Sequence, residues 1–316
     1  MSREPAASAR PRIGDLARRQ RDELLREPGL AWDLGGLTVA LTTRLPDLSV
    51  WIGEAYGHHP RLDPATTVID VAARVTAEAG PRRLLGRRAH LRVDGTTPLQ
   101  PFPASKAPLL FEWGLNWAIA ERAHWYLMIH AATIARNGLG LILPGQPGTG
   151  KSTLAAGLVR SGWQLLSDEF ALLGLNDGLL YPLRRPISVK GDALAMFQAV
   201  AWARMSAGCY DSEKGRIGFY IPDAARGDYA SAPARPAAIV VLDRDPDAPL
   251  DVDRISGADA FVHATRNSFN YTSLGEPGFR AMRDLVGACG RFYLRYPDVE
   301  AATAPLDDLL SSTRMG

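Results

Sequence analysis

A run of eight residues, 145 to 152, has the spacing of a phosphate-binding loop. It reads Gly-Gln-Pro-Gly-Thr-Gly-Lys-Ser and fits the pattern G-x-x-x-x-G-K-[S/T] throughout. In such a loop the backbone N–H groups surround the β-phosphate, and the N-terminus of the next helix adds partial positive charge. Lys151 is expected to reach the β- and γ-phosphates, and the Ser152 hydroxyl is expected to bind Mg²⁺. The residues predicted to contact a nucleotide are Gly145, Gln146, Pro147, Gly148, Thr149, Gly150, Lys151, Ser152 and Thr153.

The residues on either side of the loop predict the strand and the helix that such a motif requires. Apolar residues from 139 to 143 predict a buried strand that enters the loop. After the loop, Leu154, Leu158 and Val159 recur at helical spacing, and Gly162 is a stop signal. The motif therefore has the context of strand, loop and helix that separates it from an unrelated glycine-rich turn.

An acid pair follows the loop after one predicted helix. The apolar residues 163–166 lead into Ser167, Asp168 and Glu169, and residues 170–173 are apolar again, which predicts a strand with a bend at the acids. A hydroxyl that attacks a γ-phosphoryl group needs a proton acceptor, commonly an aspartate. Asp168 is the candidate, because its strand should end beside the loop. It could instead be a metal ligand or a helix cap. Glu169 is expected to be associated with the metal.

His130 lies upstream of the loop, in the strand-like run 126–132. Asn137 and Gly138 predict a tight turn from this run back into the loop strand. His130 is therefore expected on the hairpin partner of the loop strand, where it could hydrogen-bond Asp168 and adjust its pKa. A histidine in an apolar run can also be a core residue with no part in catalysis.

Taken together, these residues resemble the catalytic domain of HPr kinase/phosphorylase, which phosphorylates a serine of the phosphocarrier protein HPr. The resemblance covers roughly residues 126–190 and includes the spacings from His130 to Lys151 and from Lys151 to Asp168. It implies an α/β P-loop fold of the PEP carboxykinase/HPr-kinase type. It also implies that His130 is the catalytic histidine, that Asp168 is the general base, and that Lys151 and Ser152 bind phosphate and metal.

The chain departs from that family at three places. Glu169 stands where the family usually has Asp, Gln146 stands at a position that is acidic in the family, and the later signature stretch is missing. The resemblance therefore does not extend to a phosphorylase activity or to HPr as the substrate. The chain is more similar to the HPr-kinase-related proteins, which include kinases of peptide-modifying gene clusters and whose substrates are peptides or are unassigned.

The sequence thus predicts a kinase that transfers the γ-phosphoryl group of ATP to a serine of a peptide or small protein. Asp168, His130 and Lys151 are the predicted catalytic residues, and Ser152 and Glu169 are the predicted Mg²⁺ ligands. A small-molecule kinase acting on a sugar or amino acid, and a switch or scaffold that binds ATP without transferring it, are the alternatives. Asp243 ends the apolar run 237–242 and competes for the acidic role, but a Pro-rich, acidic segment follows it and indicates a surface loop.

Other segments are expected to support this site. Residues 184, 185 and 190 are three cations that could stabilise charge in transfer or lie on a solvated turn. Residues 213–216 could form a mobile basic loop over the nucleotide. The hexapeptide 266–271 lies between two helical patterns and could contact the substrate or simply pack as a helix turn.

Residues 13–122 are expected to form an α+β region that serves as a lid, an oligomer contact or a docking domain. Its predicted elements are a helix over 13–26, strands over 37–43, 48–52, 67–72 and 90–93, a connection over 98–108 and an apolar helix over 109–125. Residues 123–316 are the expected catalytic domain. Residues 1–12 are rich in Ala, Pro and Arg and are expected to be disordered.

The composition indicates a globular protein. The chain has 316 residues, of which 46% are hydrophobic, and a formal net charge of +2, so it offers no strong field for nucleic acid. Arginine pairs such as Arg82-Arg83 and Arg87-Arg88 are expected to be solvated surface. Only two cysteines occur, with no metal-ligand spacing, which favours a reducing cytoplasm. We expect no membrane partner, and homo-oligomers are possible.

Overall fold

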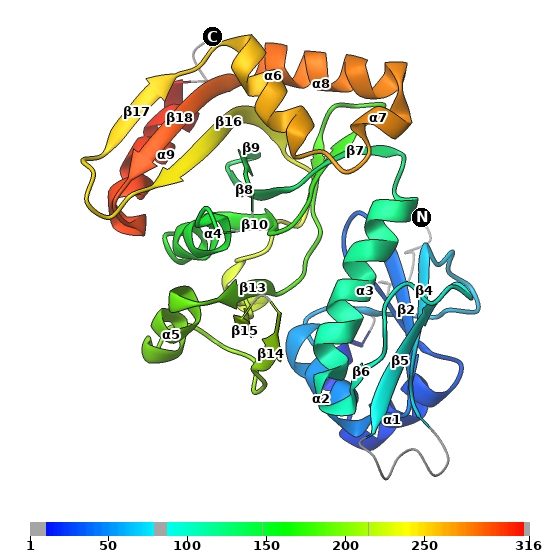
Figure 1. Cartoon of the computed structure of the whole chain (residues 1–316). Coiled ribbons are helices and arrows are strands. Elements are labelled where there is room, and N and C mark those ends of the chain that lie inside the picture. The colour runs from blue at the N-terminus through cyan, green and yellow to red at the C-terminus, as the bar shows by residue number, and fades with distance from the viewer. Residues whose placement is uncertain (1–10, 79–86, 147, 214, 313–316) are drawn as a thin grey trace, which may run out of the picture. The chain divides into compact units, whose positions relative to one another are not determined.

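The computed structural model describes residues 11–78, 87–146, 148–213 and 215–312 (Figure 1). It divides into two compact units, one that ends at Ala118 and one that begins at Ile119. Each unit combines β-sheets with helices, so the chain is a mixed α/β protein. The predicted disorder of residues 1–12 and the pair Arg82-Arg83 fall mainly or wholly outside the described residues. In the described part of the chain, no helix combines the length and apolar character needed to cross a bilayer.

The first unit is built on a six-stranded sheet in the order β3-β1-β2-β4-β5-β6. Its elements are η1 (Ile13–Asp15), α1 (Arg18–Arg26), β1 (Leu30–Asp33), β2 (Thr38–Thr43), α2 (Pro46–Ala55), β3 (Arg61–Leu62), β4 (Val71–Ala77), β5 (Arg88–Val93), β6 (Phe102–Pro103), η3 (Ala104–Lys106) and α3 (Ala107–Arg122), which continues into the second unit. Aromatic rings fill the core: the Trp32 ring centre lies 5.1 Å from Tyr56 and 6.2 Å from Phe111. The Tyr56 hydroxyl donates to the buried Glu112, so this carboxylate has a partner within the core.

Several sequence predictions for this unit are wrong. Residues 48–52 form the middle of helix α2 and not a strand, because Pro46 begins a helix whose buried residues 48, 51, 52 and 55 recur at helical spacing. The helix predicted over 13–26 is divided into η1 and α1. Each of these helices is capped at its N-terminus by a side chain of its own first turn. The Arg12 N–H donates to Asp15, and the Ala17 N–H donates to Gln20. The connection 98–108 contains strand β6, and the strand expected from residue 67 begins at Val71.

The second unit contains a six-stranded sheet in the order β10-β8-β9-β16-β18-β17 and two sheets of three strands, β12-β11-β7 and β13-β15-β14. Its elements are β7 (Tyr126–Ile129), β8 (Ala131–Arg136), β9 (Leu139–Pro144), α4 (Lys151–Arg160), β10 (Gln164–Ser167), β11 (Ala171–Gly174), β12 (Leu180–Tyr181), β13 (Ile187–Lys190), α5 (Asp192–Ala199), β14 (Tyr210–Ser212), β15 (Gly215–Tyr220), η4 (Ala224–Arg226), β16 (Arg235–Arg244), β17 (Asp251–Arg254), α6 (Gly257–Arg266), α7 (Tyr271–Leu274), α8 (Glu276–Ala288), β18 (Gly290–Tyr296) and α9 (Val299–Ser312).

Helices cover both faces of the six-stranded sheet (Figure 1). One core cluster packs α4 and α9 against β9, β16 and β18, and a second packs α6 and α8 against the other face. Strands β9, β16 and β18 run parallel. Ligand sites in such sheets form at the carboxyl ends of the parallel strands, which here is where β9 leads into α4.

The hairpin before the loop forms as predicted. Asn137 and Gly138 have φ values of 54° and 76°, which is the pair of left-handed conformations that a tight hairpin turn of this hand needs. The turn joins β8 to β9, which pair antiparallel in a continuous register from Ala131 with Pro144 to Arg136 with Leu139.

The strand predicted over 126–132 is in fact two strands. β7 pairs with β11 in the three-stranded sheet, whereas β8 pairs with β9 and β10 in the six-stranded sheet. His130 lies at the break between them, not within the hairpin partner of the loop strand. The predicted bend at the acid pair separates β10 from β11 in the same way. The two breaks are neighbours, because both chain segments pass from one sheet to the other.

Candidate active site

The glycine-rich loop connects β9 to α4. Residues 145–150 form the loop, and Lys151, Ser152 and Thr153 form the first turn of the helix. Gly148 and Gly150 have φ values of 96° and 88°, a region that L side chains rarely adopt. A Cβ at Gly150 would also lie 2.7 Å from the Tyr296 hydroxyl oxygen. Glycine is therefore required where the backbone turns into the helix. Pro147 lies outside the described residues.

The Lys151 ammonium spans this loop. Its Nζ donates to the carbonyl oxygens of Gly145 at 2.6 Å and Gln146 at 3.0 Å. Burial lowers the pKa of Lys151, while the charges of Asp168 and Glu169 act in the opposite direction. An ammonium has three N–H donors, so the two carbonyls leave one for an anion at the helix N-terminus.

Asp168 lies beside the first turn of α4. Its Oδ2 accepts a hydrogen bond from the Ser188 backbone N–H at 3.2 Å, and the side chain is almost completely buried. Burial, followed by the charge of Glu169, raises the pKa of Asp168 to about 7, against the opposing effects of the Ser152 hydroxyl, the Ser188 N–H and Lys151. A carboxyl group with this pKa exchanges its proton near neutral pH, as a general base must.

His130 contacts the second acid and not the first. Its Nε2 lies 3.3 Å from Oε2 of Glu169, so the predicted contact with Asp168 is wrong. Asp168 is held toward α4 and Ser188, whereas Glu169 points toward the break between β7 and β8. Burial acts to raise the pKa of Glu169, but the hydrogen bond and charge of His130, together with the charges of Arg185 and Lys190, outweigh burial and lower it.

Of the three cations that follow the acid pair, one lies on a strand. Lys190 ends β13, whereas Arg184 and Arg185 precede that strand. Arg185 is buried, and it and Lys190 both favour the ionised form of Glu169. These two cations therefore stabilise the charge of Glu169. In the predicted basic loop 213–216, Gly215 and Arg216 are the first residues of strand β15, and Lys214 lies outside the described residues.

Asp243, the competing acid, is occupied elsewhere. Its Oδ2 accepts hydrogen bonds from the Tyr293 hydroxyl and from Arg295 Nε, and the Tyr293 bond is the main cause of its lowered pKa. The next residue, Arg244, is the one whose side chain passes close to Gly150. Successive strand residues point to opposite faces, so Asp243 faces away from the loop.

The segment after α6 adjoins the loop. The Gln146 amide Nε2 donates to Asn267 Oδ1 at 3.2 Å, and the His130 backbone N–H donates to the Asn267 carbonyl at 2.6 Å. The mixed polar and aromatic composition of residues 266–271 was the only sequence signal for this contact.

The donor set beside the loop fits a magnesium ion held partly by a nucleotide. Mg²⁺ prefers oxygen ligands and is commonly bound by one or two protein groups together with phosphate oxygens. The Ser152 hydroxyl and the Asp168 carboxylate meet here, and Asp168 Oδ1 is buried with no partner of hydrogen-bonding geometry among the described residues. The described residues contain no group of three or more His, Cys, Asp or Glu side chains that could hold a metal without such a ligand.

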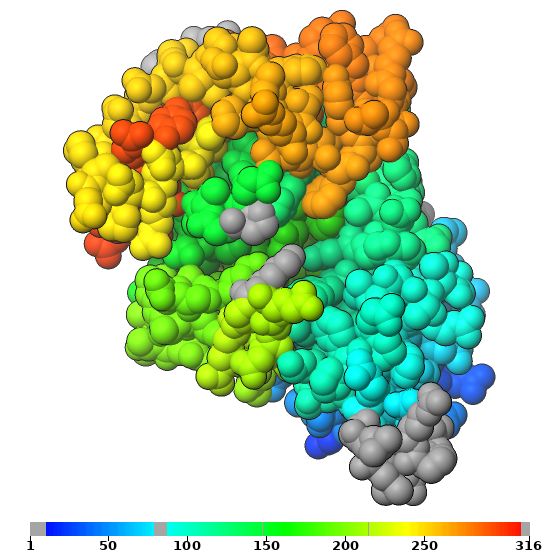
Figure 2. All heavy atoms as spheres, in the orientation of Figure 1, coloured from blue at the N-terminus to red at the C-terminus, as the bar shows by residue number. Residues whose placement is uncertain are grey.

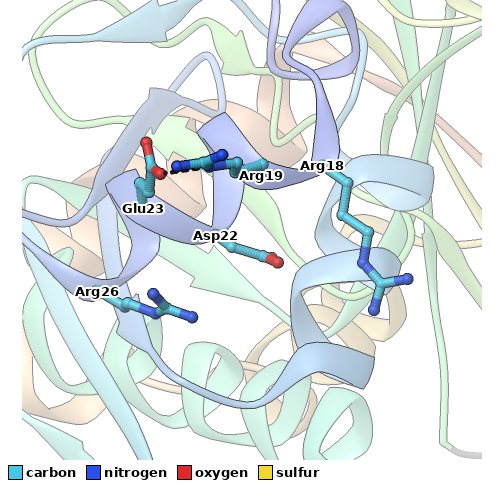
Figure 3. Close-up of a pocket in the computed structure, with 5 residues that line it drawn as sticks. All are labelled: Arg18, Arg19, Asp22, Glu23 and Arg26. Carbon is cyan, nitrogen blue, oxygen red and sulfur yellow. Dashed lines mark hydrogen bonds and ion pairs between the residues drawn. The ribbon is translucent and has the colours of Figure 1, made fainter.

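Two surface depressions are lined by other residues. One runs along α1 in the first unit and is lined by Arg18, Arg19, Asp22, Glu23 and Arg26 (Figure 3). Its Arg19–Glu23 pair, at 3.1 Å, is exposed, and such a pair contributes only about 0.3–0.5 kcal/mol. The other lies where β16 and β18 begin, at the opposite end of these strands from the loop. Neither contains a predicted site residue.

No family model and no curated protein matches the chain. Among solved structures, the chain is similar to the Hpr(Ser) kinase/phosphatase from Coxiella burnetii. The identity is 14%, the match covers 60% of this chain and 96% of that chain, and the TM-score is 0.28. A superposition of this quality carries no argument about chemistry, so the function rests on the residues of the site itself.

Proposed function

We propose that the protein is an ATP-dependent kinase that uses Mg²⁺ and phosphorylates a serine of a peptide or small protein. The observation that carries the proposal is the meeting of Asp168 with Lys151 and Ser152 at the N-terminus of α4. A buried carboxyl group with a pKa of about 7 stands beside the two side chains that a phosphate-binding loop directs at a nucleotide.

Each residue then has a distinct task. The N–H groups of the loop and the start of α4 bind the phosphates, and Lys151 neutralises charge on the γ-phosphoryl group. Ser152 would hold Mg²⁺, which would supply charge neutralisation to the phosphates when bound, and the Asp168 carboxylate beside it takes the proton. Glu169 is held by His130, so His130 acts as a positioning residue through that carboxylate.

The proposed phosphoryl transfer needs no proton acceptor other than Asp168. The acceptor oxygen forms a bond to the γ-phosphorus while the bond from that phosphorus to the β,γ-bridging oxygen breaks, which releases ADP. The proton of the acceptor hydroxyl passes to the Asp168 carboxylate. A basic group with a pKa near 7 is ionised in a useful fraction of molecules at neutral pH and can still accept this proton.

The experiment measures transfer from γ-labelled ATP to a serine-centred peptide library, with nucleotide affinity measured by calorimetry. Lys151→Ala should weaken Mg·ATP binding, and Asp168→Asn should abolish transfer while the protein stays folded and still binds ATP. Asp243→Asn is the matched control, since it removes an acid from the end of a neighbouring strand and should leave transfer intact.

The other outcomes discriminate between functions. A wild-type protein that binds no nucleotide refutes the site assignment, and retained transfer in Asp168→Asn refutes the base. If the Asn variant loses ATP affinity and Mg²⁺ dependence together with rate, Asp168 is chiefly a metal ligand. Transfer to a sugar or amino acid but to no peptide would favour the hypothesis of a small-molecule kinase. Binding of ATP without any transfer would favour the hypothesis of a switch or scaffold.

A further inference from the structure

The segment 267–270 is tied firmly to β7. The Phe269 N–H and the Ser268 hydroxyl both donate to the Met128 carbonyl, at 2.9 and 2.8 Å. The buried Asn270 side chain accepts from the Met128 N–H at 2.9 Å and donates to the Tyr126 carbonyl at 2.8 Å. These bonds extend the edge of the three-stranded sheet and fix the backbone of the segment in one conformation.

The side chain that this rigid backbone presents is an exposed aromatic ring. Phe269 is 46% exposed, although the residues on either side of it are anchored. Its ring centre lies 4.8 Å from that of Phe170 and 5.8 Å from that of His130. One side of the ring is therefore packed against residues of the site, and the other side is open to solvent. An apolar ring in such a position remains available to a partner.

The ring lies close to the acid pair. Phe170 directly follows Glu169, and His130 contacts both Phe269 and Glu169. These distances place the Phe269 ring at most about 10 Å from the Glu169 carboxylate, which an extended peptide spans with about three residues. In Figure 2 the orange segment that contains α6 and α7 borders the green segment of the loop at the molecular surface, in agreement with the bond between Gln146 and Asn267.

We propose that Phe269 forms an apolar subsite for a side chain of the acceptor peptide, within about three residues of the phosphorylated serine. The proposal rests on the kinase function above and specifies its substrate. Asp168 directly precedes Glu169, so a serine whose proton passes to Asp168 would lie near the acid pair, and a peptide that continues from it past Glu169 and His130 would reach Phe269. A rigid exposed aromatic ring recognises an apolar side chain at little cost in conformational entropy.

The probe is an oriented library of peptides with one central serine and degenerate flanking positions. Wild-type protein should select an apolar residue at one position within three of the serine. Phe269→Ala should lose that selection and raise the KM for the selected peptide roughly 3- to 10-fold, the effect of burying about half a phenylalanine side chain. Its kcat and its KM for ATP should not change, and Phe269→Leu should restore much of the selection.

Phe279→Ala is the matched control, because Phe279 is an equally exposed phenylalanine, at 48%, on helix α8. It should leave the selection unchanged. Selection retained by a folded Phe269→Ala protein overturns the subsite while leaving the kinase function standing. A raised KM for ATP alone also overturns it and assigns the ring to the adenine base. Failure of the wild-type protein to phosphorylate any peptide refutes the kinase proposal and the subsite with it.

Discussion

Replacing Asp168 with Asn should stabilise the folded protein, by an amount that depends on pH. Below the ordinary pKa of 3.8, the carboxyl group is protonated in both folded and unfolded chains, so it contributes no difference. Between 3.8 and about 7 only the folded chain retains the proton, and each pH unit lowers the stability of the wild type by about 1.4 kcal/mol. Above pH 7 the cost is complete, at roughly 4 kcal/mol. Asn is neutral at every pH and avoids this cost.

The measurement is urea unfolding of the wild type and Asp168→Asn at several pH values from 5 to 9, with EDTA present and without nucleotide. The difference in the free energy of unfolding should increase by roughly 3 kcal/mol between pH 5 and pH 8, in favour of the variant. Asn can still accept the bond from the Ser188 N–H, so the change in charge is the main effect. Asp247→Asn, at an exposed loop position, should differ from the wild type by no more than about 0.5 kcal/mol at each pH.

The opposite sign would refute this reasoning. If Asp168→Asn loses stability relative to the wild type as pH rises, then Asp168 is ionised and well paired in the folded protein, and burial does not control its proton. A difference that does not change with pH would show that the carboxyl group has the same pKa in both states. In either case Asp168 would not be a base tuned to neutral pH.

Two further predictions concern the frame of the site. Gly150→Ala should cost about 1–3 kcal/mol of unfolding free energy and weaken nucleotide binding, because φ is 88° and the new Cβ meets the Tyr296 hydroxyl; Gly287→Ala, in open space on α8, should not destabilise, and equal stability of the two variants would contradict the strained turn. Asn270→Ala should cost roughly 2–4 kcal/mol in urea unfolding, because it leaves two backbone groups of β7 without partners. A cost below 0.5 kcal/mol would show that water replaces these bonds.

The sequence could predict the parts of the site that depend on local chemistry. The strand, loop and helix around residues 145–152 follow from apolar spacing and glycine positions, and the Asn137-Gly138 turn follows from the need for positive φ at both residues. The bend at Asp168 and Glu169 also follows, since two charged residues interrupt an apolar run. Each of these signals lies within a few residues of the feature that it determines.

The sequence could not predict which acid His130 contacts. That choice depends on the chain leaving one sheet for another at residue 130, and a continuous apolar run gives no sign of a change of sheet. The contact of Asn267 with Gln146 is equally invisible to local patterns, because it joins residues 121 positions apart. Helix α2 is hard to predict because a short apolar run is consistent with both a strand and a buried helix, and only Pro46 signals the start of a helix.

Two chain segments pass from the small sheet to the large one at the site, so the positions of the site residues depend on how the two sheets are oriented. Strands β7 and β11 belong to the small sheet, β8 and β10 belong to the large one, and the His130–Glu169 bond joins the two points of passage. A change in the angle between the sheets therefore moves Glu169 and His130 relative to the loop. By linkage, any ligand that fixes the acid pair also restrains that angle. Substitutions in the core of the small sheet are thus expected to shift Glu169 and His130 without touching either residue.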